Sequence, residues 1–410
     1  MFDTLYIGMS GMDGFSKGLK VISNNLANLN SPGFRSSTLQ FTDAYYLQQG
    51  LTAEGDGGSS GGQGTLFGSG VQTLSTFLDL HAGDTQQTSN PLDVAVSGEG
   101  YLVARDKQGT QTYTRDGQLE FDRNGDLVST TTGKYIMGYA GSNGGILTKI
   151  SLDGLRTNPA KATANVTFSG NLTTGTSTTG ATTPPPTATF AVIDDAGGQH
   201  SLVATFTRGT APGSTLSWNV AVTDGATNVG SGTISFSAGS PDPAADKVTF
   251  AYAPGGRAPF DVTLDFSTNV TAFDTGNLTT LAVASQDGFS AGSISKTTFD
   301  SDGKLTLTYS NGQTMTGAQL ALATFDTGRT LQQLGAAEFT SSAPGDAHLG
   351  RANTGGTGTI VASAIEESNV NLSSEFSNLI VMQRGYQASS NVLSTVNDML
   401  QELFDMRGGR

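Results

Sequence analysis

The residue types that most often do chemistry in proteins are sparse in this sequence. There is no cysteine, which excludes disulfides, thiolate metal sites and cysteine nucleophiles. The three histidines, His81, His200 and His348, are far apart along the chain. Asp79 lies two residues before His81, and we interpret Asp79-Leu-His81 as a polar strand end rather than a pair of metal ligands.

One loop superficially resembles a calcium site. The segment Asp122-Arg-Asn-Gly-Asp126 has acidic and amide side chains around a glycine. An EF-hand loop needs glycine at its sixth position and glutamate at its twelfth, and neither is present. A hairpin turn is therefore the favoured interpretation. Because no phosphate loop or metalloprotease motif occurs either, we expect no enzyme, cofactor or metal.

Composition narrows the possible partners. The chain of 410 residues has a net charge of −14 and only 21 Lys and Arg, without a basic run, so we expect no nucleic-acid partner. No stretch of about 18 apolar residues occurs, so we also expect no membrane insertion. The first residues lack a basic start followed by an apolar run, which predicts that any export uses no cleavable signal peptide.

Near the N-terminus, apolar residues recur mainly at spacings of three and four, the pattern of one helical face. They are Leu5, Met12, Phe15, Leu19, Ile22, Leu26 and Leu29. The helix should end near Asn30, because Pro32 disfavours a helical residue before it and Gly33 permits a reversal. Several glycines make this helix marginal in isolation.

The C-terminal end repeats the pattern over about 36 residues, or roughly 50 Å of helix. Its stripe is Leu372, Phe376, Leu379, Met382, Tyr386, Leu393, Val396, Leu400 and Leu403. Ser389 and Ser390 interrupt it where an apolar residue is expected. Asn371 or Ser373 could cap the start of this helix. The two stripes could pack within one chain, form a coiled-coil dimer, or serve as a polymerisation seam.

The middle of the chain has strand and turn patterns. Gln108-Gly109, Asp116-Gly117, Asn124-Gly125 and Thr132-Gly133 place a glycine every eight residues, which predicts a β-meander with tight turns. The segment from Phe299 to Leu305 repeats the pattern from Phe121 to Leu127. Further along, the Thr- and Gly-rich zone offers strand candidates at 188–193, 202–207, 216–222, 247–251 and 262–266.

This order of elements predicts a mixed, mainly β fold with terminal α-helices. Because the patterns are nested, we expect discontinuous β-domains and a paired N- and C-terminal helical coiled-coil domain. The expected parts are a helical polymerisation domain (1–30 and 365–410), a connector (31–70), a discontinuous β-domain (71–145 and 285–364) and an inserted outer β-domain (146–284).

Three segments carry a family resemblance. The stretch from Ser23 to Arg35 includes Asn25, Asn28, Asn30, Ser31, Pro32, Gly33 and Phe34. It resembles the N-terminal signature of the flagellar rod and hook axial proteins. Glu367–Leu372 followed by Met382–Ala388 is similar to the C-terminal signature, and Asn90–Leu102 to the motif of the first β-domain. The three occur in the order of the family.

The resemblance implies a structural subunit of the bacterial flagellar hook, a curved homopolymeric tube that links rod to filament in motility. It also implies partners: other copies of the chain, the distal rod protein, the hook cap protein, the hook–filament junction protein and the flagellar type III export apparatus. The location would be the extracellular hook of the flagellar basal body. The length favours a hook subunit over one alternative, a distal rod subunit. The other alternative, a secreted β-rich adhesin, should have exposed aromatic residues on its β-domain, yet Trp218 is the only tryptophan.

Overall fold

The computed structural model describes residues 2–43, 46–49, 65–68, 70–141, 145–175, 184–209, 216–276, 278–325, 331–341 and 345–408. The chain forms two compact units. Unit 1 comprises residues 1–153, 297–306 and 316–410, and unit 2 comprises residues 154–296 and 307–315. Strands dominate both, and the only long helices among the described residues are at the two ends of the chain. The predicted fold class, mainly β with terminal helices that pack together, is confirmed.

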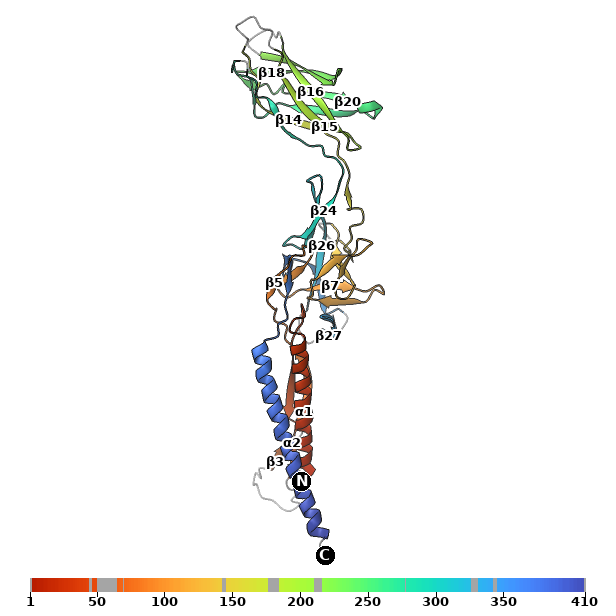
Figure 1. Cartoon of the computed structure of the whole chain (residues 1–410), viewed down its shortest axis with the longest axis vertical. Coiled ribbons are helices and arrows are strands. Elements are labelled where there is room, and N and C mark those ends of the chain that lie inside the picture. Colours follow the sequence, from red (N-terminus) through yellow and green to blue (C-terminus); the bar gives the residue numbers. More distant parts are fainter. Residues whose placement is uncertain are drawn as a thin grey trace, which may run out of the picture. The chain divides into compact units, whose positions relative to one another are not determined.

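Helices α1 (Phe2–Ala27) and α2 (Leu372–Gly408) lie side by side in unit 1 (Figure 1). The backbone leaves α1 through turns that lead to Gly33, which has a φ of 68°. At the start of α2, the side chain of Asn371 accepts a hydrogen bond of 3.0 Å from the backbone N–H of Ser374, so Asn371 is the cap.

A two-stranded ribbon covers a second side of α1. Its strands are β1 (Ser37–Asp43) and β4 (Val71–Leu78), which pair antiparallel with Ser37 opposite Leu78. Both strands contact α1. Strands β2 (Tyr46–Gln49) and β3 (Thr65–Gly68) also pair. The expected connector at 31–70 therefore contains strands, while its glycine-rich part at 50–64 lies outside the described residues.

The β part of unit 1 has the sheet order β26-β11-β7-β8-β28-β27, and β7 also pairs with β26. Its aromatic and aliphatic core includes Tyr101, Tyr113 and Phe339. The strands that lie wholly in this part are β5 (Thr85–Gln87), β6 (Val94–Ser97), β7 (Tyr101–Arg105), β8 (Gln111–Thr114), β9 (Leu119–Phe121), β10 (Leu127–Ser129), β11 (Tyr135–Tyr139), β12 (Leu147–Lys149), β27 (Leu331–Gly335), β28 (Glu338–Ser341), β29 (Ala347–Arg351), β30 (Thr359–Ala362) and β31 (Ala364–Glu366).

The predicted meander is correct at three of its four turns. Gly109, Gly125 and Gly133 all have positive φ. The prediction is wrong at Asp116-Gly117, because β8 and β9 do not pair with each other. A Cβ atom on Gly117 would lie on the backbone of Val94, whose N–H donates a hydrogen bond of 3.0 Å to the Gly117 carbonyl. This glycine is required for close backbone approach rather than for a hairpin.

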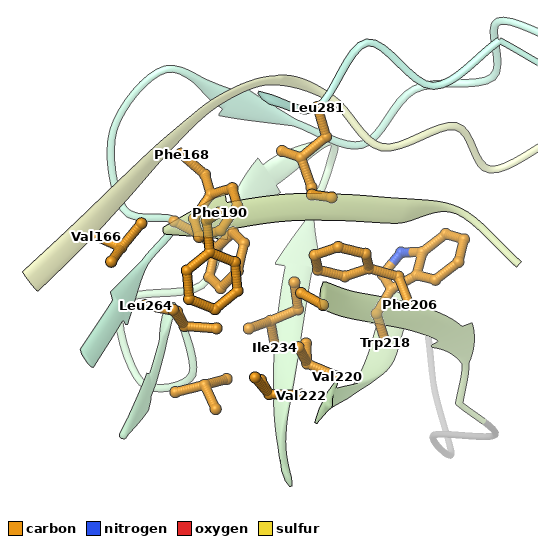
Figure 2. Close-up of a cluster of buried hydrophobic side chains, with 14 of the residues drawn as sticks. Val166, Phe168, Phe190, Phe206, Trp218, Val220, Val222, Ile234, Leu264 and Leu281 are labelled. Atoms are coloured by element: carbon orange, nitrogen blue, oxygen red, sulfur yellow. The ribbon is translucent and has the colours of Figure 1, made fainter. Parts of the chain in front are cut away.

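Unit 2 packs two sheets face to face, β15-β16-β17-β18-β19 against β20-β21-β14-β22 with β23 beside β14. Figure 2 shows aromatic and aliphatic side chains meeting in its core. All five strand candidates in this zone coincide with strands. The strands are β13 (Thr157–Asn158), β14 (Asn165–Asn171), β15 (Thr187–Ile193), β16 (Gln199–Arg208), β17 (Leu216–Asp224), β18 (Thr227–Ser237), β19 (Ser240–Pro241), β20 (Lys247–Tyr252), β21 (Phe260–Asp265), β22 (Val270–Thr271) and β23 (Ala282–Gln286), with a 3-10 turn at Pro254–Gly256.

Three further strands have residues in both units: β24 (Gly292–Phe299), β25 (Lys304–Tyr309) and β26 (Thr314–Phe325). The turn between β24 and β25 has the same hydrogen bonds as the turn between β9 and β10. Gly303 N–H donates to the Asp300 carbonyl at 2.9 Å, as Gly125 N–H does to the Asp122 carbonyl at 2.9 Å. The similarity of these two segments in sequence therefore reflects a similar turn.

Candidate self-association surface

The α1–α2 contact depends on small residues that let the helices approach. A Cβ atom on Gly385 would lie 2.6 Å from the ring of Phe15, and one on Gly11 would lie 2.8 Å from the hydroxyl of Ser389. Gly18 likewise faces Met382. Ser389, which interrupts the apolar stripe in the sequence, is thus a residue that faces a glycine. Large side chains on one helix fill the space that glycines leave on the other.

The residues of the predicted stripes differ in how far they are buried. Ile22 on α1 is buried, and the other predicted α1 residues, Leu5, Met12, Phe15, Leu19 and Leu26, are partly buried, as is Leu29 in the turn after α1. On α2, Val396 is buried, and Leu379, Leu393 and Leu400 are partly buried. Four predicted α2 residues are instead exposed: Leu372, Phe376, Tyr386 and Leu403. The predicted stripes thus correspond largely to a contact within one chain.

A second apolar face of α2 is uncovered among the described residues. We call it the outer stripe, and it consists of Val381, Val392, Met399, Leu403 and Met406, which are 62, 43, 52, 43 and 79 % exposed. Their spacings of 11, 7, 4 and 3 residues keep them on one side of a helix. At ~100° per residue, this side is roughly 100° around the helix from the side that faces α1.

The asparagine-rich motif after α1 makes bonds within the chain. Asn25 is 1 % exposed, and its side-chain amide donates to the Ser37 carbonyl at 2.8 Å and to Glu375 Oε1 at 3.0 Å. Its oxygen accepts the Ser37 N–H at 3.0 Å. Asn28 donates to the Asn24 carbonyl at 2.9 Å and accepts from the Ser31 hydroxyl at 3.1 Å. These bonds end the helix and tie it to β1 and α2.

The rest of the motif surrounds a cavity of about 470 Å³ in unit 1. Asn30, Ser31, Pro32 and Phe34 line one side, and the turn between β27 and β28 lines the other. Gly33 passes so close to the backbone of Arg115 that a Cβ atom would lie 2.6 Å from the Arg115 carbonyl carbon. Gly33 is therefore required both for its positive φ and for this approach.

Two histidines form pairs with carboxylates, and sequence reasoning missed one of these two pairs. His81 Nδ1 lies 2.5 Å from Asp79 Oδ1 just after β4, on a side chain that is 92 % exposed. His200 Nε2 lies 3.1 Å from Asp194 Oδ2 across the β15–β16 hairpin, a pair whose separation of six residues matches no ligand spacing. In the part of the chain that the structure describes, no three His, Asp or Glu residues are grouped to hold a metal ion. Within that part, neither helix is apolar enough over a sufficient length to cross a membrane.

Comparisons with known proteins give one consistent family. Three family models match the chain: "Flagella basal body rod protein" over residues 5–35, "Flagellar hook protein FlgE/F/G D1 domain" over 95–180, and "Flagellar basal body rod FlgEFG protein C-terminal" over 361–406. The flagellar hook protein FlgE of Escherichia coli K12 is 28 % identical over 420 residues, which are 97 % of this chain and 98 % of that protein.

The flagellar hook protein FlgE of Treponema pallidum is 27 % identical over 467 residues, covering 99 % of this chain and all of that protein. The solved structure of the Helicobacter pylori flagellar hook protein FlgE2 covers 69 % of this chain and 99 % of its own, with a TM-score of 0.44 and 13 % identity. That score is too low to define a shared arrangement.

These findings define a flagellar axial protein with terminal helices and nested β parts. The chain belongs to the flagellar hook protein family. The resemblance drawn from its sequence is confirmed, and so is the expectation of a structural hook subunit, because hook proteins match over nearly their whole length, unit 2 included. The distal rod subunit and the secreted adhesin are not supported. Its location is the flagellar hook.

Proposed function

We propose that copies of this chain assemble into the hook tube through their terminal helices, and that α2 makes the principal contact with other copies. One observation carries this proposal: α2 has two apolar faces, of which α1 covers only one. A helix with a single stripe is satisfied by one partner, whereas a helix with two needs a third helix.

The neighbours of α1 explain why most of the exposed apolar surface of the helix pair is on α2. The ribbon of β1 and β4 covers α1 on a second side, with the rings of Phe15 and Phe41 6.0 Å apart and Thr73 beside Gly14. No described strand covers the outer stripe of α2 in this way. Fully burying an exposed Leu, Met or Val side chain contributes about 1.5–3 kcal/mol. A contact that joins different faces of two copies builds a helical polymer when its rotation does not close into a ring.

The finer partners follow from the same role. We infer that the tube begins on the distal rod protein, grows beneath the hook cap protein, and ends at the hook–filament junction protein. Subunits would reach this position through the flagellar type III export apparatus, without a cleavable signal peptide. Of the predicted polymerisation seam, Leu403 belongs to the outer stripe and is retained in this proposal, whereas Leu372, Phe376 and Tyr386 are exposed on other sides of α2.

The test compares two variants of α2, one with a new charge in the outer stripe and one with the same charge on another side of the helix. Met399→Asp puts a carboxylate in the outer stripe, where assembly would bury it, and we expect at least a tenfold rise in the protein concentration needed for tubes. Gln401→Asp is the matched control, because Gln401 is also exposed but roughly 200° further round the helix. Sedimentation and electron microscopy measure assembly, and circular dichroism confirms equal helix content. Normal tubes from Met399→Asp would reject the outer stripe as the contact.

A further inference from the structure

A buried glutamate joins three distant parts of unit 1. Glu366 Oε1 lies 2.6 Å from Arg35 Nη2, and Glu366 Oε2 lies 3.0 Å from Arg115 Nη1. The side chains of Arg35, Arg115 and Glu366 are 0, 1 and 2 % exposed. Arg35 lies in the segment after α1, Arg115 follows β8 in the β part, and Glu366 is the last residue of β31, from which the chain runs to α2. Each also lies in a different one of the three segments that the family models match.

Backbone groups converge on the same point. The carbonyl of Glu366 accepts the Gly33 N–H at 2.9 Å, and its Oε1 accepts the Gly83 N–H at 2.9 Å. Three residues further on, Asn369 accepts the Ser36 N–H at 2.7 Å and donates to the carbonyls of Asp79 and His81 at 2.9 and 3.0 Å. The chain leaving α1 and the chain approaching α2 are thus bonded to each other beside the β part.

The two arginines have different attachments. Arg115 also donates to the carbonyls of Val96 at 3.1 Å and Gly98 at 2.6 Å, and its guanidinium lies 4.7 Å from the centre of the Tyr101 ring. Arg115 is therefore anchored within the β part. Arg35 contacts Glu366 through its ion pair. Glu366 therefore connects Arg35 to Arg115 and so to the β part.

Stability alone does not account for this arrangement. Burying two guanidinium groups with one carboxylate costs more desolvation than an apolar cluster of the same size, and one attested role of a buried polar or ionic group is to select one geometry. Here the geometry in question is the direction of both helices. Arg35 is eight residues after the end of α1 at Ala27, and Glu366 is six residues before the start of α2 at Leu372.

We propose that Glu366, Arg35 and Arg115 form a clasp that sets the orientation of the helix pair relative to the β part of unit 1. Glu366 and Arg35 are positioning residues for the helices, and Arg115 is their fixed point. Asn25 carries this orientation into the helices, because it bonds to Ser37 just after the clasp and to Glu375 on α2. This inference deepens the proposed function. In the proposed tube, the clasp holds the helices of each copy at one angle to the β part of the same copy.

The experiment measures orientation directly. The chain has no cysteine, so spin labels attach only at introduced positions, Lys20→Cys on α1 and Glu120→Cys on β9, both exposed. In the otherwise unchanged full-length monomer we expect one narrow distance distribution by pulsed electron paramagnetic resonance. Arg35→Met leaves Glu366 paired with Arg115, and we expect the distribution to become at least twice as wide.

Lys149→Met is the control, because it removes a different ion pair of the same β part, between Lys149 and Asp126, and should leave the width unchanged. Hydrogen exchange of β7 and β8 should show equal protection in the Arg35→Met variant and the parent. An unchanged width in Arg35→Met overturns the proposal, and so does loss of protection in β7 and β8, since Arg35 would then stabilise the β part itself. A failure of the assembly proposal leaves this monomer measurement unaffected.

Discussion

Unit 2 and the terminal helices bury apolar surface in different ways. In unit 2, residues such as Phe168, Phe206 and Leu264 are at most 1 % exposed, and both sheets turn their apolar faces toward one another (Figure 2). In the helix pair, Ile22 and Val396 are the two buried aliphatic residues among those described, at 6 and 5 % exposed, and the outer stripe stays in solvent. Unit 2 completes its core alone, whereas the helices leave one apolar face of α2 exposed.

This difference teaches where each region gets its stability. A closed core has a free energy of folding that its own sequence determines, and substitutions there act locally. A helix pair that relies on glycine contacts has little burial of its own, so its stability depends on what covers the remaining face. The following predictions test that contrast.

The largest effect should come from the core of unit 2. Phe168 is fully buried and stacks on Phe266, with ring centroids 4.7 Å apart. Phe168→Ala should lower the free energy of unfolding of unit 2 by about 3–5 kcal/mol through the lost burial and the cavity. Trp218, the single tryptophan, lies in this core and reports its unfolding by fluorescence. Phe273→Ala, at a residue 53 % exposed, is the control and should cost far less.

A break in α2 should affect the terminal helices and leave unit 2 unchanged. Leu393→Pro removes a helical hydrogen bond in the middle of α2 and adds a steric clash, at a cost of about 3 kcal/mol or more. We expect no tubes by electron microscopy and lower helix content by circular dichroism, with the Trp218 unfolding transition unchanged. A variant that still forms normal tubes would count against the role of α2, and a shifted Trp218 transition would show that the regions are not independent.

Local patterns explain what the sequence could predict. The strands of unit 2 were predictable because alternating or β-branched residues between turns encode them locally, as in Leu216–Asp224. The Asn371 cap was also predictable, since a cap bonds to a residue three positions away. Pairs distant in sequence carry no such signal. Arg115 and Glu366 are 251 residues apart, and nothing near either residue marks the other as its partner.

The sequence could predict that the helix stripes exist, but not which surface packs against each stripe. Spacings of three and four place residues on the same side of a helix, yet they do not say which surface covers that side. Leu400 and Leu403 both fit the predicted stripe, but Leu400 is partly buried and Leu403 is exposed. Gly117 was misread for a related reason: a turn and a close backbone approach both select glycine, and only the fold distinguishes them.

The glycines of the helix pair permit a finer test with identical substitutions. A Cβ atom on Gly8 would have its nearest neighbour at 3.6 Å, an ordinary contact, whereas one on Gly385 would meet Phe15 at 2.6 Å. Alanine favours a helix over glycine by about 1 kcal/mol. Gly8→Ala should therefore raise the midpoint of helix melting, measured by circular dichroism at 222 nm. Gly385→Ala should lower it or leave it unchanged, because Phe15 must move. Equal gains at both positions would mean that glycine packing does not limit the approach of the helices.

The smallest effect should be a dependence of unit 2 on acid. The His200 hydrogen bond, followed by the Gly198 backbone N–H, lowers the pKa of the Asp194 carboxyl from its ordinary 3.8. A carboxyl whose pKa is lowered in the folded state stabilises that state above pH 3.8, and this contribution is lost as the pH falls through the lowered pKa. Asp194→Asn should therefore be less stable than the parent at about pH 5, and the gap should shrink below pH 3.8, as measured by urea midpoints from Trp218 fluorescence. Asp195→Asn is the control: its carboxyl is 69 % exposed and lies 3.5 Å from Arg257, so it should change the midpoint less at either pH. A gap between Asp194→Asn and the parent that does not vary with pH would show that Asp194 acts through the shape of the β15–β16 hairpin rather than through its charge.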